Sequence, residues 1–88
     1  MTASTREIRV ELILHAVLRE SAAVERVALR LPVGATAASA LAVVVERHPM
    51  LATHAKTVAF ARGDAIIRPD ATLQDGDRVE VLPPVSGG

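Results

Sequence analysis

The chain has 88 residues, half of them apolar, and its ten basic and ten acidic residues cancel. This length supports one domain with a single modest core, and the apolar content excludes a disordered chain. The charge balance argues against nucleic-acid and acidic-membrane partners, and the absence of cysteine excludes a disulfide, a zinc–thiolate site and a thiol nucleophile.

Two strands are predicted in the first third of the chain. Residues 7–14, EIRVELIL, alternate between apolar and polar side chains, which indicates a strand with one buried face. Residues 24–31, VERVALRL, repeat this pattern, with Val27, Leu29 and Leu31 inward. The connection HAVLRESAA is longer than a tight hairpin loop, so we expect a short helical turn within it.

A helix is predicted over residues 37–47, after the break at PVGA. Thr36 is a suitable N-cap, and the alanine-rich composition favours a helix in spite of three consecutive valines. We expect Leu41, Val44 and Val45 to be among the residues that face the sheet. The helix should end at His48, because the residue before a proline avoids the helical region.

The second half of the chain is predicted to return to strands. Residues 56–61 indicate a strand, residues 62–64 a turn, and Ile66 and Ile67 a short extended piece. Asp75-Gly76 supplies turn chemistry before a final strand in which Val79 and Val81 point inward. The predicted fold class is therefore α+β, with a mixed sheet and one main helix packed on one face.

No candidate catalytic or metal site emerges from the side chains. The three histidines have no recognised ligand spacing, and the aspartates of residues 64–77 do not match a calcium loop. The serines lie in no nucleophile-elbow context. The longest apolar run, ALAVVV at 40–45, is too short to span a bilayer, and the N-terminus lacks a signal-peptide pattern. We therefore expect a soluble cytoplasmic protein that does not catalyse a reaction alone.

The last residues, LPPVSGG, suggest how such a chain takes part in chemistry. We expect a globular domain over 1–82 and an extended reactive tail over 83–88. Pro83 and Pro84 favour an extended exit, and six residues reach at most about 20 Å. Gly87 and Gly88 carry no Cβ, so the tail can thread a narrow tunnel and present the Gly88 carboxylate for activation, for example by adenylation. A frayed end is the alternative.

The segment LQDGDRVEVLPPVSGG resembles the C-terminal signature of the molybdopterin synthase small-subunit family, whose members are ubiquitin-like sulfur carriers. The segment VLRE at 17–20 is similar to an early segment of that family, and the predicted element order suits its β-grasp fold. The chain departs from the family pattern at Leu82, where a phenylalanine is common, and at Arg62, where an asparagine is usual.

The resemblance implies a role as sulfur donor without catalytic residues or a bound cofactor of its own. An E1-like adenylyltransferase would use ATP to adenylate the carboxylate of Gly88, and a sulfur-donating enzyme would convert it to a thiocarboxylate. The tail, Pro83, Pro84, Val85, Ser86 and Gly87, would thread into the large synthase subunit and deliver sulfur to a pterin precursor. Leu82 and Val85, apolar and predicted to be exposed, would dock that partner.

Three alternatives stay open from the sequence. The chain could carry sulfur for another pathway, such as thiamine synthesis or amino-acid sulfur incorporation. It could be a ubiquitin-like modifier that is joined to lysines through Gly88. It could also be a plain β-grasp binding module whose tail has no role.

Overall fold

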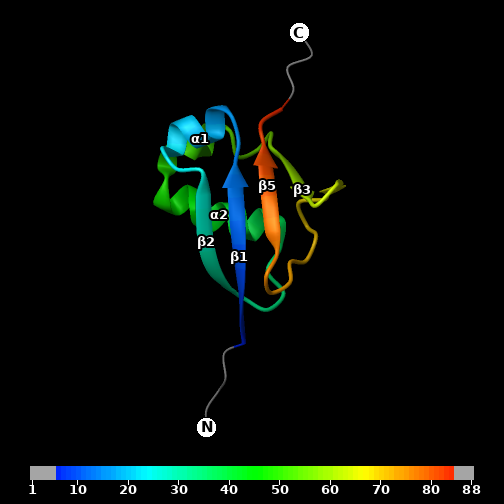
Figure 1. Ribbon diagram of the computed structural model, residues 1–88. Coiled ribbons are helices and arrows are strands. Elements are labelled where there is room, and N and C mark those ends of the chain that lie inside the picture. Colours follow the sequence, from blue (N-terminus) through cyan, green and yellow to red (C-terminus); the bar gives the residue numbers. More distant parts are fainter. Residues whose placement is uncertain (1–5, 85–88) are drawn as a thin grey trace.

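The computed structural model describes residues 6–84, which form a five-stranded sheet with helices on one side (Figure 1). In chain order the elements are β1 (Glu7–Leu14), α1 (Val17–Ala22), β2 (Arg26–Pro32), α2 (Ala37–Arg47), the 3-10 helix η1 (Pro49–Thr53), β3 (Ala59–Arg62), β4 (Ala65–Ile67) and β5 (Arg78–Leu82). This architecture confirms the predicted α+β class.

The sheet is mixed, with the strand order β2-β1-β5-β3-β4. β1 pairs with β2 antiparallel and with β5 parallel, and β3 pairs antiparallel with both β5 and β4. The first and last strands of the chain therefore lie side by side in the centre of the sheet. In their parallel register Leu14 lies opposite Val81, so β5 ends at the same end of the sheet as β1.

The core lies between the sheet and α2 and follows the alternation in the sequence. The inward face of β1 is buried from Ile8 to Leu14, and Val79 and Val81 of β5 are fully buried beside it. Leu41 and Val44 of α2 are buried against this face, while Val45 is half-buried and packs on its margin. Phe60, the one aromatic residue of the chain, completes this otherwise aliphatic core.

The start of α2 is fixed by a reciprocal cap. Thr36 Oγ1 accepts the Ser39 N–H at 3.1 Å, and Ser39 Oγ accepts the Thr36 N–H at 2.8 Å. These bonds satisfy two backbone donors that have no partner within the helix. The predicted N-cap at Thr36 and the predicted range of 37–47 are both confirmed.

Two predicted strand ranges are shifted. β2 covers 26–32 rather than 24–31. The C-cap of α1, Ala23, has a left-handed conformation that reverses the chain direction, so the strand begins only after this turn. β3 begins at Ala59 rather than at residue 56, because a turn intervenes in which Thr57 bonds back to the His54 carbonyl. Pro49 does not only end α2 but also begins η1, since its fixed φ suits the first position of a helix.

Candidate functional site

The turn Asp75-Gly76-Asp77 fixes the start of β5 against β1. Gly76 has φ 89°, a left-handed conformation that glycine adopts without steric cost. Its N–H donates to the Arg9 carbonyl at 2.7 Å, and the Asp77 carbonyl accepts the Glu11 N–H at 2.9 Å. β5 is therefore aligned with β1 from its first residue.

Both carboxylates of this turn bind backbone groups. Asp75 Oδ1 accepts the Arg9 N–H at 2.7 Å, and Asp77 Oδ2 accepts the Gln74 N–H at 2.8 Å. Asp77 Oδ2 also accepts a bond from Arg62 Nη1 at 2.9 Å, and the same Arg62 nitrogen donates to the Thr72 carbonyl at 3.2 Å. The two aspartates thus stabilise the turn by accepting backbone hydrogen bonds, Asp75 from β1 and Asp77 from within the turn. Arg62 connects the turn to β3.

The other end of β5 is the root of the C-terminal segment. The His15 N–H donates to the Val81 carbonyl at 3.2 Å, and Leu82 is paired with Ala59 of β3. On the sheet face opposite the core, His15 Nε2 and Glu80 Oε1 form a hydrogen bond of 2.9 Å. β5 is thus paired with β1 as far as Val81 and with β3 as far as Leu82, its last residue.

The predicted site residues lie partly within this region. Leu82 lies on the face opposite Val79 and Val81, but it is half-buried and not exposed as predicted, because it is paired with Ala59 of β3. Pro83 is half-buried and Pro84 is exposed, directly beyond the end of β5. Val85, Ser86, Gly87 and Gly88 lie outside the described residues. The separate domain over 1–82 and reactive tail over 83–88 stay predictions.

The sequence did not point to the His15–Glu80 pair or to the role of Arg62. His15 and Glu80 are 65 residues apart and become neighbours only through the parallel pairing of β1 with β5. Alternation does place Glu80 and Leu82 on one face. Only the strand order, however, puts His15 beside them.

The described part of the chain offers few other chemical groups. Within residues 6–84, no group of three His, Cys, Asp or Glu side chains is placed to hold a metal ion. His48 and His54 occupy the C-caps of α2 and η1. No helix in this part of the chain is long and apolar enough to cross a membrane.

The sequence is similar to that of known proteins. The model of the ThiS family matches residues 12–88. The molybdopterin synthase sulfur carrier subunit of Chlamydomonas reinhardtii is 35% identical over 83 residues, which cover 92% of this chain and 100% of that protein.

Solved structures share the fold. The crystal structure of SAMP1, small archaeal modifier protein 1, from Haloferax volcanii has a TM-score of 0.77 at 27% identity and covers 91% of this chain and 99% of its own. A complex of subunits 1 and 2 of the molybdopterin-converting factor from Helicobacter pylori 26695 contains a chain with a TM-score of 0.61 at 24% identity, covering 92% and 100%. The ubiquitin-like β-grasp fold is confirmed.

Proposed function

The chain belongs to the ThiS family of ubiquitin-like sulfur carriers, and we propose that it is the sulfur carrier subunit of a molybdopterin synthase. The observation that carries this proposal is the 35% identity to a protein of that name over that protein's whole length. The complex of two molybdopterin-converting factor subunits contains a chain of the same fold, which makes a large synthase subunit the expected partner.

In the proposed reaction the domain supplies one reacting group, the carboxylate of Gly88. A carboxylate is a poor electrophile, so an E1-like adenylyltransferase first joins it to AMP from ATP and releases pyrophosphate. Sulfur at the oxidation level of sulfide, delivered by a sulfur-donating enzyme, then attacks the acyl carbon and displaces AMP, leaving a thiocarboxylate. In the large subunit this sulfur passes to the pterin precursor, and the Gly88 carboxylate is regenerated by water.

The described residues contribute position and not catalysis. β5 is clamped to β1 by the Asp75-Gly76-Asp77 turn at one end and by the His15 N–H at the other. Pro83 and Pro84 fix φ and favour an extended path away from the sheet. The tail can then reach about 20 Å, while the rigid domain docks outside the partner's active site.

An intact-mass measurement tests the proposal. We expect the wild-type chain, incubated with the E1-like enzyme, ATP and a sulfur donor, to gain the mass difference between one sulfur and one oxygen atom. A chain that lacks Gly88 should not gain it and should melt at the same temperature, because residues 6–84 are intact. Asp64→Ala, in the exposed β3–β4 turn, is the matched control and should be loaded normally. A wild-type chain that never gains sulfur contradicts the proposal.

A second candidate is a ubiquitin-like modifier, which the likeness to SAMP1 favours. In that case the activated Gly88 carboxylate would form an isopeptide bond with a lysine amine. Peptides that carry the C-terminal residues of this chain on a lysine, recovered from cells after proteolysis, would support the modifier role. Their absence from cells that contain the thiocarboxylate form would leave only sulfur transfer.

A further inference from the structure

β2 forms one edge of the sheet, and its free side carries a defined set of backbone groups. Antiparallel pairs alternate between residues that exchange hydrogen bonds and residues that do not. The Leu14 N–H bonds to the Glu25 carbonyl at 2.7 Å, and the Val33 N–H bonds to the Arg6 carbonyl at 3.2 Å. The backbone N–H and C=O groups of the odd-numbered residues of β2 therefore point toward β1. Those of the even-numbered residues point away from it, so the N–H groups of Arg26, Ala28 and Arg30 lie on the open side.

Two arginines face each other beside this open edge. Arg9 of β1 is the direct partner of Arg30 of β2, and the alternation makes them a non-hydrogen-bonded pair, the type in which side chains are closest. Like charges directly opposite each other destabilise a sheet. Within residues 6–84, neither guanidinium lies in an ion pair. Glu7 and Asp75 line a hollow with these two arginines, but within the described residues neither carboxylate forms an ion pair with them.

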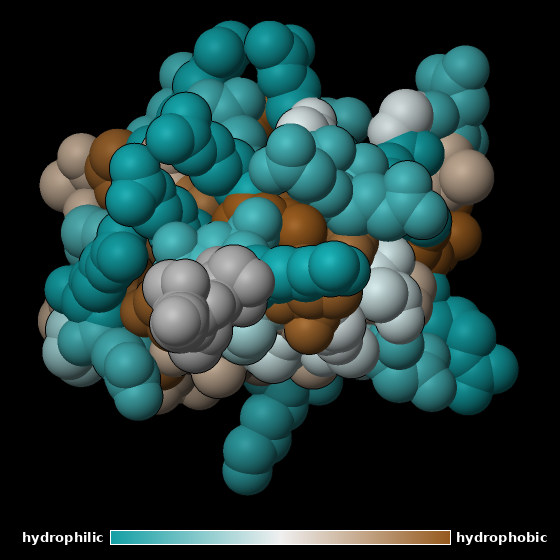
Figure 2. Space-filling view, turned by 90° about the horizontal axis from the view of Figure 1, so that it is seen from below, coloured by the Kyte–Doolittle hydropathy of each residue, from teal (hydrophilic) through white to brown (hydrophobic). Residues whose placement is uncertain are grey.

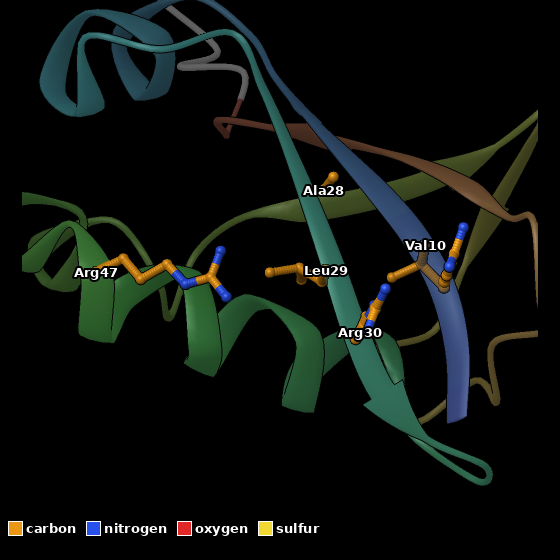
Figure 3. A pocket seen from close by; sticks show the side chains of 6 residues that line it. Val10, Ala28, Leu29, Arg30 and Arg47 are labelled. Atoms are coloured by element: carbon orange, nitrogen blue, oxygen red, sulfur yellow. The ribbon is translucent and has the colours of Figure 1, made fainter. Parts of the chain in front are cut away.

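A third arginine, which comes from the helix side of the sheet, lines a surface hollow of about 440 Å³ at this edge. Arg47, in the last turn of α2, lines this hollow with Arg9, Arg30 and Ala28, and its side chain extends toward β2 (Figure 3). An adjoining hollow is lined by Glu7, Asp75 and the same two arginines. The end of the molecule at which β1 begins is mainly hydrophilic, with hydrophobic atoms visible between the hydrophilic side chains (Figure 2).

We propose that the edge of β2 binds an extended, acidic segment of a partner protein as an additional strand. The backbone of that segment would pair with Arg26, Ala28 and Arg30, which is the mode of β-strand addition. Its carboxylates would lie over Arg9 and Arg30, since guanidinium groups bind carboxylates through two parallel hydrogen bonds. Occupation by the segment would relieve the repulsion between the two arginines.

A second copy of this chain is a poorer occupant of the same edge. Antiparallel pairing of two β2 strands centred on Ala28 would place Arg26 of each copy opposite Arg30 of the other. Four like charges would then meet in one interface, so the same arginines that attract an acidic strand oppose self-association.

The proposed surface is separate from the tail and does not depend on the proposed function. Arg9 lies six residues before His15, whose N–H bonds to Val81 near the end of β5. Six residues of strand span about 20 Å. A partner can therefore hold the β2 edge while the tail is engaged elsewhere.

Titration of the full chain with a synthetic peptide of alternating glutamate and valine tests the proposal. We expect saturable NMR shifts at the amides of Arg26, Ala28 and Arg30, and binding that weakens as salt is added. A peptide with lysine in place of glutamate should not bind. A glutamate peptide that is N-methylated at alternate residues should lose binding, since it cannot pair with an edge; unchanged binding would overturn strand addition.

An arginine variant tests the charge pair. Arg30→Gln should weaken binding of the acidic peptide by about tenfold or more, because it removes one guanidinium of the pair. Its melting temperature should not fall, because the like-charge neighbour is gone. Arg68→Gln, on an exposed residue beyond β4, makes the same change in net charge and should bind normally. Equal affinities of the two variants would overturn the proposal, as would self-association of the wild type through β2.

Discussion

At the scale of single residues, the Asp75-Gly76-Asp77 turn shows how local chemistry positions a remote terminus. Each aspartate accepts a backbone N–H, and Asp77 also accepts a bond from Arg62, with side-chain exposures of 37% for Arg62 and 20% for Asp77. This arginine stands where the family pattern has an asparagine. Its long side chain reaches both the Thr72 carbonyl and the Asp77 carboxylate.

We expect Asp77→Ala to lower the free energy of unfolding by roughly 1 to 3 kcal/mol, because the hydrogen bonds that its carboxylate accepts from the Gln74 N–H and from Arg62 are lost. Urea denaturation measures the change. Asp64→Ala is the control, since Asp64 is exposed and makes no side-chain hydrogen bond within residues 6–84. Equal stabilities of the two variants would show that the turn is held by its backbone alone.

The sequence predicted the turn at Asp75-Gly76 but not its contacts. Glycine after aspartate is typical of a turn, and this signal is local. The acceptor role of Asp75 toward the Arg9 N–H joins residues 66 positions apart, and it requires the parallel pairing of β1 with β5. Periodicity predicts which face a residue occupies, and it carries no information about which strands are neighbours.

At the scale of elements, α1 is flanked by two alanines with positive φ. Ala16 has φ 54° and Ala23 has φ 60°, values that residues with a Cβ rarely adopt, and Ala23 lies in the left-handed helical region. Ala23 is the C-cap, a position at which glycine is common because it has no steric penalty there. The sequence has no glycine between the first two strands, and so the sharp ends of this helix could not be predicted.

A glycine should therefore have opposite effects at two exposed alanines. Ala23→Gly should raise the free energy of unfolding, by up to about 1 kcal/mol, because it removes the left-handed strain. Ala42→Gly, at an exposed interior position of α2, should lower it by about 1 kcal/mol through the loss of helix propensity. Thermal unfolding of both variants compares them directly, and a loss of stability in Ala23→Gly would contradict this account of α1.

At the scale of the whole molecule, the strands and the main helix could be predicted, whereas the 3-10 helix η1 and the strand order could not. The alternation over 7–14 and the capped helix over 37–47 have strong local signals, and both ranges agree with the structure. The central pairing of β1 with β5 depends on contacts between the two ends of the chain. That pairing places Ile13, Glu80 and Leu82 on one face beside the root of the tail.

This face is predicted to dock the large synthase subunit. Leu82 is half-buried, so part of its apolar surface is available to a partner next to the start of the C-terminal segment. Complete burial of such a side chain contributes roughly 1.5 to 3 kcal/mol. We therefore expect Leu82→Asp to weaken binding to the large subunit by a factor of about ten or more, since 1.4 kcal/mol corresponds to tenfold.

Isothermal titration against the large subunit measures this effect, and two further variants make it decisive. Val33→Asp introduces the same charge at a side chain that is 58% exposed. Val33 directly follows the last residue of β2, at the end of the sheet that is farther from Leu82, so this variant should bind normally. Leu82→Ala removes the apolar contact without a new charge, and it keeps the test valid if Leu82→Asp does not fold. If a folded Leu82→Ala variant binds with wild-type affinity, Leu82 is not part of the interface, and the partner is bound through the tail without it.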